Sequence, residues 1–447
     1  MKGAASPASG GTRFVSTRDP ERRPVALADA VRLGLAPDGG LFVPTHVPVL
    51  GADWPAAQTW SDVIGAVLRP WLDPGDADAW VADARAALDF PVPLRPLGGE
   101  RYLLELFHGP TLAFKDVAAR TMARWWGRTL TGAGERATVL VATSGDTGSA
   151  VADGFAGVPG LRVAVLYPAG RVSAVQERQL IASRPGVEAF AVEGTFDDCQ
   201  RLVKAALVDP ELAPLRLSTA NSINIGRLLP QMTYYAWAAV QLARLRPGSE
   251  PPLVSVPSGN LGNLTAGLLT ASMGVRIGRF VAAHNANDFF PRYLSGEAAA
   301  FEYGRTVATV ANAMDVGAPS NFERLHALFG EGRWPAPVSG AVVDDAAALE
   351  RMALVWQGDG RLVCPHTAIA LEAIERVRAA EGSWRTVPAI ALATAHPAKF
   401  PDVVARAVPE GRPTHPTLEA LERAPTRVRP LPATSRDLAD ALRRSTA

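Results

Sequence analysis

From about residue 101 onward, short apolar runs alternate with longer segments in which apolar residues recur at helical spacing. Runs rich in β-branched residues are typical of buried strands, and the runs separated by helices are what a parallel sheet covered on both faces requires. The chain is therefore predicted to be an α/β protein with open parallel sheets. The predicted strands cover residues 137–142, 162–167, 187–192, 253–256, 279–283 and 389–394.

The two ends of the chain have a different pattern. Residues 14–96 consist of short helical patterns broken by turns, with no recognisable chemical motif, and are predicted to form a small helical N-terminal domain. The segment Asp38-Gly39-Gly40 is typical of a tight turn, because glycine accepts positive φ. After about residue 406 the chain is rich in Arg, Pro and Glu, and this tail is expected to lie on the surface with one helix near 418–423.

Composition narrows the functional classes. The chain has 447 residues and a net charge of +1, from 45 basic and 44 acidic residues, so it offers no basic excess for nucleic acid. We find no signal peptide and no apolar run of about 18 residues, and expect a cytoplasmic protein that does not enter membranes. The two cysteines cannot build a disulfide framework, no Cys/His group has zinc spacing, and we predict no metal site.

Lysine is scarce in this sequence. The only four lysines are Lys2, Lys115, Lys204 and Lys399, against 41 arginines. Lys115 lies in the segment 107–116 (FHGPTLAFKD), where a Gly-Pro turn leads into a helical pattern between apolar neighbours. Desolvation and a helix N-terminus both favour the neutral amine, which suits a Schiff-base lysine. The alternative is a surface lysine that pairs with Asp116.

Two loops, each between a predicted strand and a predicted helix, could bind anions. The first is 143–149 (TSGDTGS) and the second is 258–263 (SGNLGN). Backbone N–H groups at such junctions bind phosphate or carboxylate, although each loop could also be an ordinary turn. Neither loop has the spacing of a nucleotide-phosphate motif. Together with one candidate lysine, the two loops suggest pyridoxal 5′-phosphate and an anionic substrate.

Other polar residues are individually less informative. Asn224 and Arg227 begin a long helical pattern, and Arg227 could clamp a phosphate or carboxylate, or could form a structural salt bridge. His366 could be a loop histidine or a group beside the substrate. Cys199 is predicted to be buried and inert.

The motifs above, in this order, resemble those of the threonine synthase family, in its longer bacterial and fungal type with an extra N-terminal domain. The resemblance begins at 15–18 (VSTR) and 34–44 (GLAPDGGLFVP) and includes the lysine segment and both loops. It continues through 224–231, 287–288 (ND), 312–317 (NAMDVG) and 364–368 (CPHTA), and so spans almost the whole chain.

The resemblance implies a fold and a reaction. The fold is that of the tryptophan synthase β-subunit group (fold type II), with two open, mostly parallel sheets, flanking helices and the small N-terminal domain. The implied domains are 1–96, then a large cofactor-binding domain of 97–130 and 221–447, and a small mobile domain of 131–220. The implied reaction converts O-phospho-L-homoserine and water into L-threonine and phosphate, in a monomer or homodimer.

The resemblance also implies residue roles. Lys115 matches the Schiff-base lysine, which would also move the substrate protons. The loop Ser258, Gly259, Asn260, Leu261, Gly262 and Asn263 matches the loop that holds the cofactor phosphate. Asp146 lies beside the pyridine hydroxyl, where relatives often have Asn, and Thr394 faces the pyridine nitrogen. Thr111, Ser144 and Thr147 are candidates for the substrate carboxylate or phosphate, and Asn224 and Arg227 for the substrate phosphate.

Two alternatives remain open. A sister pyridoxal-phosphate enzyme, such as a serine/threonine dehydratase or cysteine synthase, would share the lysine and both loops but would not need a second phosphate site. A homologue that binds ligands without catalysis would have no need of Lys115.

Overall fold

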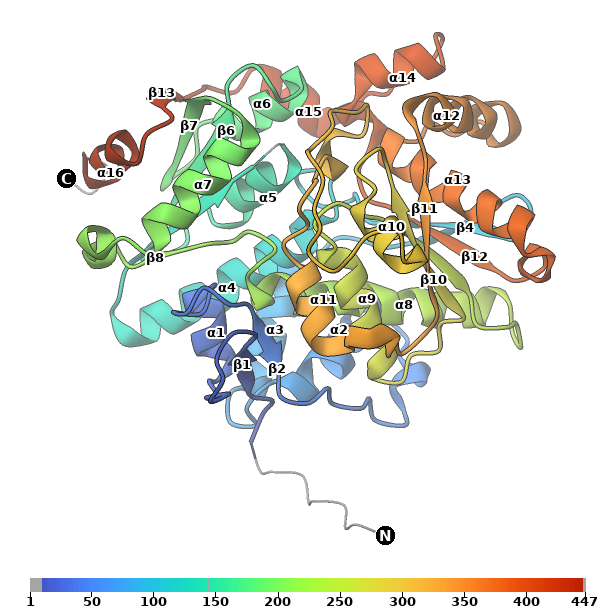
Figure 1. The fold of residues 1–447 in the computed structure, drawn as a ribbon, viewed down its shortest axis with the longest axis horizontal. Coiled ribbons are helices and arrows are strands. Elements are labelled where there is room, and N and C mark those ends of the chain that lie inside the picture. The colour runs from blue at the N-terminus through green and yellow to red at the C-terminus, as the bar shows by residue number, and fades with distance from the viewer. Residues whose placement is uncertain (1–9, 144, 445–447) are drawn as a thin grey trace.

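A computed structural model gives the fold of residues 10–143 and 145–444, which are the residues described below. Its framework is two separate, mostly parallel sheets flanked by helices (Figure 1). The strand order is β11-β10-β9-β12-β4-β3 in the six-stranded sheet and β13-β7-β6-β5-β8 in the five-stranded sheet. The predicted α/β class is therefore confirmed.

The five-stranded sheet is parallel throughout, and its central strands are almost entirely buried. Burial on both faces explains why these strands read as continuous apolar runs. The strands are β5 (Ala137–Ala142), β6 (Leu161–Pro168), β7 (Val187–Glu193), β8 (Leu217–Ser218) and β13 (Arg429–Pro432). Helices α5 (Asp146–Gly154), α6 (Ala174–Ile181), α7 (Phe196–Leu207) and α16 (Ser435–Arg444) flank them.

The six-stranded sheet is parallel except for its edge strand β3, which runs antiparallel to β4. Its strands are β3 (Leu94–Leu97), β4 (Arg101–Glu105), β9 (Leu253–Pro257), β10 (Arg279–His284), β11 (Val338–Val342) and β12 (Ala389–Ala393). Around it lie α4 (Lys115–Ala133), α8 (Leu229–Leu245), α9 (Gly262–Ser272), α10 (Phe289–Ser295), α11 (Phe322–Phe329), α12 (Asp345–Asp359), α13 (Pro365–Ala380) and α14 (Pro401–Ala407). Helix α15 (Pro416–Glu422) packs instead against α6.

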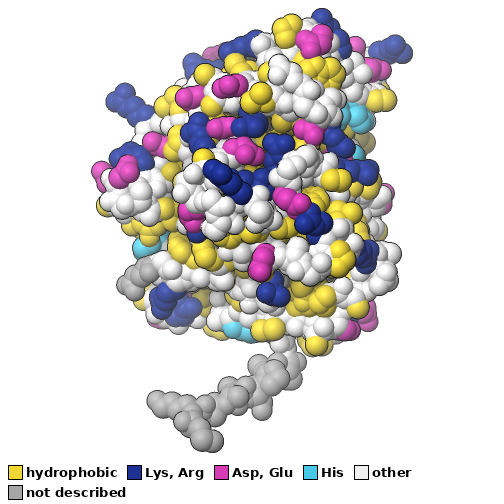
Figure 2. All heavy atoms as spheres, turned by 90° about the vertical axis from the view of Figure 1, so that its right-hand side faces the viewer, with side chains coloured by type: hydrophobic (Ala, Val, Ile, Leu, Met, Phe, Trp, Pro, Cys, Tyr) yellow, Lys and Arg dark blue, Asp and Glu magenta, His cyan; other side chains and the backbone are white. Residues whose placement is uncertain are grey.

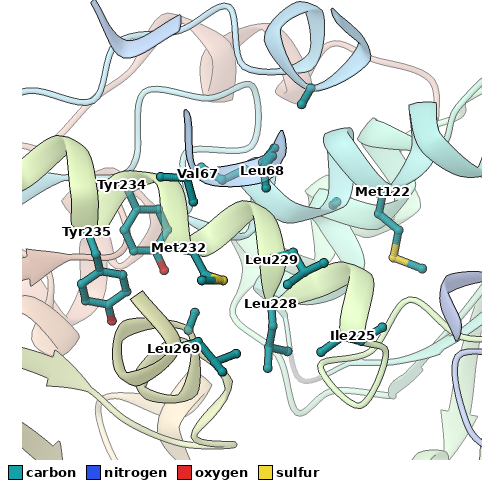
Figure 3. Close-up of a cluster of buried hydrophobic side chains, with 14 of the residues drawn as sticks. Val67, Leu68, Met122, Ile225, Leu228, Leu229, Met232, Tyr234, Tyr235 and Leu269 are labelled. Carbon is teal, nitrogen blue, oxygen red and sulfur yellow. The ribbon is translucent and has the colours of Figure 1, made fainter. Parts of the chain in front are cut away.

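The N-terminal segment shares its core with the rest of the molecule. It forms the hairpin of β1 (Phe14–Ser16) and β2 (Phe42–Pro44) and helices α1 (Leu27–Leu33), α2 (Trp60–Leu68) and α3 (Ala77–Ala87). Val67 and Leu68 of α2 lie over Leu229 and Met232 of α8, which in turn face Leu269 of α9 (Figure 3). This continuous core fixes α8 and the short turn before it, which carries Arg227.

The C-terminal tail returns to the five-stranded sheet. Its strand β13 pairs with β7, and α16 packs against α7 (Figure 1, upper left). The domain boundaries inferred from the sequence place this tail with the large domain, whereas its backbone hydrogen bonds join it to the sheet of residues 137–218. We propose that residues 131–220 form one domain, and that strand β13 of the tail joins this domain as an edge strand of its sheet.

The surface carries charges of both signs. On the face shown in Figure 2, basic and acidic side chains are interspersed over the whole view. Within the described ranges, no helix has both the length and the apolarity needed to cross a membrane. In the same part of the chain, no group of three or more His, Cys, Asp or Glu side chains could hold a metal ion.

Candidate active site

A cavity lies where the carboxyl ends of strands from both sheets meet. Its free space is about 950 Å³, including the mouth, and its walls come from the segments after β5, β9 and β12, from the start of α4, and from the turn before α8. Ligand sites in parallel α/β proteins lie at this end of the strands. The cavity is lined by Lys115, Thr143, Asp146, Thr147, Arg227, Ser258, Gly259, Asn260, Leu261, Gly262, Asn263, His366 and Thr394, together with other residues.

Lys115 is the first residue of α4, as the sequence pattern predicts. Its Nζ lies 5.1 Å from the centre of the Phe114 ring, and no carboxylate in the described part of the chain lies within ion-pair distance. Burial lowers the pKa of Lys115 to about 8, because desolvation and the nearby Arg227 outweigh the opposing charge of Asp146. The alternative, a surface lysine paired with Asp116, does not hold for the described residues: that carboxylate accepts from Thr111, at 2.8 Å from its N–H and 2.5 Å from its hydroxyl.

Asp146 begins α5 and is buried. Burial alone would raise its pKa, but the positive charges of Lys399 and Lys115 outweigh burial and hold the pKa well below its usual value. Its Oδ1 lies 2.8 Å from Lys399 Nζ and accepts a hydrogen bond from Gln176 at 3.1 Å. This lowered pKa favours the ionised form of Asp146 in the cavity that Lys115 also lines.

The loop 258–261 leads from β9 into α9 and turns its backbone toward the cavity. At Gly259 a Cβ atom would lie 3.1 Å from Met314 Cα and 3.2 Å from the carbonyl oxygen of Ala313, so a larger residue would press against the backbone of that segment. Among the described residues, the N–H groups of Gly259, Asn260 and Leu261 have no acceptor. Together with the first N–H groups of α9, they form an anion cradle at a helix N-terminus.

Arg227 reaches the cavity from the turn before α8 and is 2% exposed. One Nη donates to the carbonyl oxygen of Ala220, while Nε is buried and has no partner in the described structure. Burial lowers its pKa to about 10. A buried guanidinium with a free donor has the chemistry to bind an anion that enters the cavity.

Two residues that were predicted to bind the substrate are hydrogen-bonded within the protein. The Asn224 side chain donates to the carbonyl oxygens of Val31 and Thr219 and accepts from the N–H of Gly226, so it holds the turn before α8. The hydroxyl of Thr111 is bonded to Asp116. Neither residue lines the cavity.

The remaining predicted residues lie at the cavity or outside the described chain. Thr147 and Thr394 line the cavity, whereas Ser144 is not among the described residues. His366 also lines it, with both ring nitrogens buried and unpartnered in the described structure, and burial lowers its pKa to about 4. His108 lies elsewhere, with Nε2 at 2.8 Å from Glu105. Cys199 is buried, as predicted.

The sequence pattern did not identify two buried residues of this region. Lys399 follows β12 and pairs with Asp146, and Gln176 of α6 packs against Gly145, where a Cβ atom would approach its side chain to 2.5 Å. A signal for Lys399 was present: it is one of four lysines, in the apolar setting Pro397-Ala398-Lys399-Phe400. Gln176 had no such signal.

Comparisons with known proteins cover nearly the whole chain. The family model described as pyridoxal-phosphate dependent enzyme matches residues 90–390, and the models for the threonine synthase N terminus and C-terminal region match 13–78 and 367–442. The threonine synthase of Haemophilus influenzae is 40% identical over 91% of this chain and 94% of its own.

Solved structures agree with these matches. The crystal structure of threonine synthase from Escherichia coli superposes with a TM-score of 0.88 at 36% identity, over 97% of this chain and 99% of that one. The pyridoxal-phosphate-bound threonine synthase from Brucella melitensis gives 0.87 at 34% identity, over 97% and 99%.

Proposed function

The chain belongs to the threonine synthase family of pyridoxal-phosphate-dependent lyases, and we propose that it converts O-phospho-L-homoserine and water into L-threonine and phosphate. The observation that supports this phosphorylated substrate is the environment of Arg227. Its buried guanidinium, with a free Nε, adds a second anion site to a cavity that already has the cradle at 258–261. A cofactor with one phosphate and a substrate with another would use both sites.

The cavity residues fit pyridoxal phosphate. The unbonded N–H groups of the loop 258–261 suit the cofactor phosphate, and the unpartnered Nδ2 of Asn263 adds a donor beside them. Asn263 is itself held in place, because its Oδ1 accepts from the hydroxyls of Tyr234 and Tyr235 at 2.5 and 2.6 Å. We assign Lys115 as the attachment residue, Asp146 to the pyridine hydroxyl and Thr394 to the pyridine nitrogen.

The bound cofactor supplies an electron sink for the negative charge that develops on the substrate carbons. Lys115 Nζ removes the proton from Cα, moves a proton from Cβ as phosphate leaves Cγ, and returns protons to Cγ and Cα around the addition of water at Cβ. Arg227 holds the substrate phosphate and stabilises its charge as it leaves. Thr147, at the start of α5, donates to the substrate carboxylate.

We propose that the domain around the five-stranded sheet closes over the substrate. The cavity takes part of its wall from α5 and Phe196 of this domain and part from the segments after β9 and β12, so a small rotation would exclude water. We also propose that the protein is a monomer or a homodimer. We also propose a cytoplasmic location and no nucleic-acid partner, supported by two buried, unpaired cysteines and by the balanced charge.

The scarcity of lysine makes the test direct. Purified protein with pyridoxal phosphate is reduced with borohydride, and the labelled lysine is located by peptide mass. We expect the label at Lys115, none in Lys115→Ala, and unchanged labelling in Lys204→Ala, whose side chain is exposed. Release of phosphate and formation of threonine from O-phospho-L-homoserine complete the assignment. Turnover of serine or threonine without turnover of the phosphorylated substrate would instead support the dehydratase alternative.

A further inference from the structure

Lys399 is a fully buried lysine directly behind the cavity wall. It ends the short turn Pro397–Lys399 after β12 and is 0% exposed. Its Nζ donates to the carbonyl oxygen of Thr111 at 2.9 Å and lies 2.8 Å from Asp146 Oδ1. A buried ammonium is costly unless it is paired, so this lysine and this carboxylate depend on each other.

Asp146 is the only acidic residue among the described residues that line the cavity. Two lysines are near enough to influence its charge, Lys115 inside the cavity and Lys399 behind it. The geometry pairs Asp146 with Lys399 and leaves Lys115 without a salt bridge to any described residue. Gln176 donates to the same oxygen at 3.1 Å, which holds the carboxylate on the Lys399 side.

The pair also joins the two halves of the site. Asp146 belongs to α5, a helix that flanks the five-stranded sheet, whereas Lys399 follows β12 of the six-stranded sheet. Thr111, the second acceptor of Lys399, lies in the loop that leads to Lys115 and also accepts from Gln179 of α6 at 3.1 Å. Lys399 therefore fixes the position of the carboxylate relative to the loop that carries Lys115.

We propose that Lys399 is a positioning residue for Lys115: it neutralises the Asp146 carboxylate, so that the amine of Lys115 does not have to remain charged to do so. The inference rests on the proposed role of Lys115 as the cofactor's attachment residue. In its absence, Lys115 becomes the nearest cation for a buried carboxylate. The proton on Lys115 is then bound more tightly, and less of the amine is neutral at neutral pH.

Other titratable groups face these three residues. Arg227 faces Lys115 from the turn before α8, Asp116 lies beside Thr111 on α4, and His366 faces the cavity from α13. His396 and Cys364 lie near Lys399 and Asp146. Burial lowers the pKa of both histidines to about 4, raises that of Asp116 to about 6 and raises that of Cys364. The pKa of Lys115, which burial lowers to about 8, lies within the pH range of the test below.

The test follows the rate at which pyridoxal phosphate is incorporated into protein from which the cofactor has been removed. The visible absorbance band is recorded between about pH 6.5 and about 9.5, where the neutral amine of Lys115 forms. Four proteins are compared: the unchanged chain, Lys399→Met, Asp146→Asn and the double variant. The titration of free pyridoxal phosphate is common to all four, so differences in the midpoint report on the protein.

We expect Lys399→Met to raise the midpoint by about one pH unit and to slow incorporation about ten-fold at pH 7. Asp146→Asn removes the negative charge and should lower the midpoint. The double variant removes both charges and should return the midpoint toward that of the unchanged chain. A merely structural role for Lys399 would reduce the yield or the melting temperature of the variants without this pattern of shifts.

An unchanged or lowered midpoint in Lys399→Met would overturn the proposal. If Lys399→Met does not fold, as circular dichroism would show, the other two variants decide. An unchanged midpoint in Asp146→Asn, or a double variant that matches neither expectation, would also overturn it. Failure of the proposed function has a separate signature: the unchanged chain would form no visible band, or Lys115→Ala would incorporate the cofactor equally well.

Discussion

The two buried arginines next to the cavity should respond in opposite ways to the same substitution. Arg227 is 2% exposed and Arg324 is 0% exposed, and burial lowers the pKa of Arg227 to about 10 and that of Arg324 to about 9. A cation whose pKa is lower in the folded chain destabilises the fold at every pH below the folded value. Replacement by methionine should relieve this cost in both cases.

The hydrogen bonds that each arginine makes decide whether its replacement stabilises or destabilises the fold. Arg324 donates to the carbonyl oxygens of Phe42 and Ile223, at 3.0 and 2.6 Å, to that of Ser222 at 3.4 Å and to the side chain of Asn321. Arg227 has one protein acceptor and a free Nε. A hydrogen bond from a charged group contributes about 1.5–3 kcal/mol, so Arg324→Met loses about 6–12 kcal/mol and Arg227→Met about 1.5–3 kcal/mol.

The desolvation recovered is similar at the two sites. At about 1.4 kcal/mol for each pKa unit, it is about 3 kcal/mol at Arg227 and about 5 kcal/mol at Arg324. In a chain of 447 residues, about 1 kcal/mol changes Tm by about 1 °C. Without ligand, Arg227→Met should therefore keep its Tm or gain about 1 °C, and Arg324→Met should lose several degrees.

The assay is thermal unfolding of the cofactor-free protein with and without inorganic phosphate. Phosphate at about a hundred times its dissociation constant for one site should raise the Tm of the unchanged chain by about 3 °C through mass action. Arg227→Met keeps the cradle at 258–261, so it should lose only the part of this rise that the Arg227 site supplies. A Tm loss in Arg227→Met as large as that in Arg324→Met would refute the reasoning, because Arg227 would then be a structural arginine.

Three further predictions concern the cradle, the lysine and a buried histidine. Gly259→Ala should weaken pyridoxal phosphate binding at least ten-fold, because its Cβ would meet the backbone of Met314, while Gly358→Ala, with no atom within 4 Å, should leave binding unchanged in the same absorbance titration. Burial lowers the pKa of Lys115 to about 8, so cofactor incorporation in the unchanged chain should rise with pH, with a midpoint near pH 8, and level off above about pH 9. A rise that continues above about pH 10 would contradict the burial of the amine. Burial lowers the pKa of His284 to about 4, so the stability that the neutral imidazole contributes is complete above about pH 6.5 and is lost toward pH 4. The substitution His284→Phe should therefore reduce the fall in Tm between pH 6.5 and 4.5 by about 2–3 °C, as measured by calorimetry.

Buried strands were the most predictable part of the fold. Residues 137–142 are predicted and observed as β5, because a strand enclosed on both faces is apolar at every position. The edge strands were missed for the same reason. In β11 the side chains are only half-buried or exposed and include Ser339, and β13 contains Pro430 and Pro432, which only an edge strand tolerates. Nothing local in such segments distinguishes a strand from a loop.

The site was predictable where the backbone itself is the ligand. The glycines of the loop 258–263 indicate a close approach whatever surrounds them, and the loop does line the cavity. Side chains were harder to assign, because Asn224 and Thr111 are as polar as Thr147 but are bonded to Val31, Thr219 and Asp116. Whether a polar side chain is free to meet a ligand depends on partners far away in the sequence, and a single sequence does not reveal them.

In a chain that uses arginine at most basic positions, the few positions that keep lysine point to a need for that side chain. Arginine outnumbers lysine about ten to one in this chain, and an exposed position such as Lys204 could hold either. Arginine stays charged at any physiological pH, so it cannot supply the neutral amine proposed at Lys115. At Lys399 the demand is different: a compact ammonium reaches both Asp146 and the carbonyl oxygen of Thr111 from a fully buried position, where a planar guanidinium would need more room. Under the proposal above, Lys399 pairs with Asp146, so that Lys115 is free to supply a neutral amine.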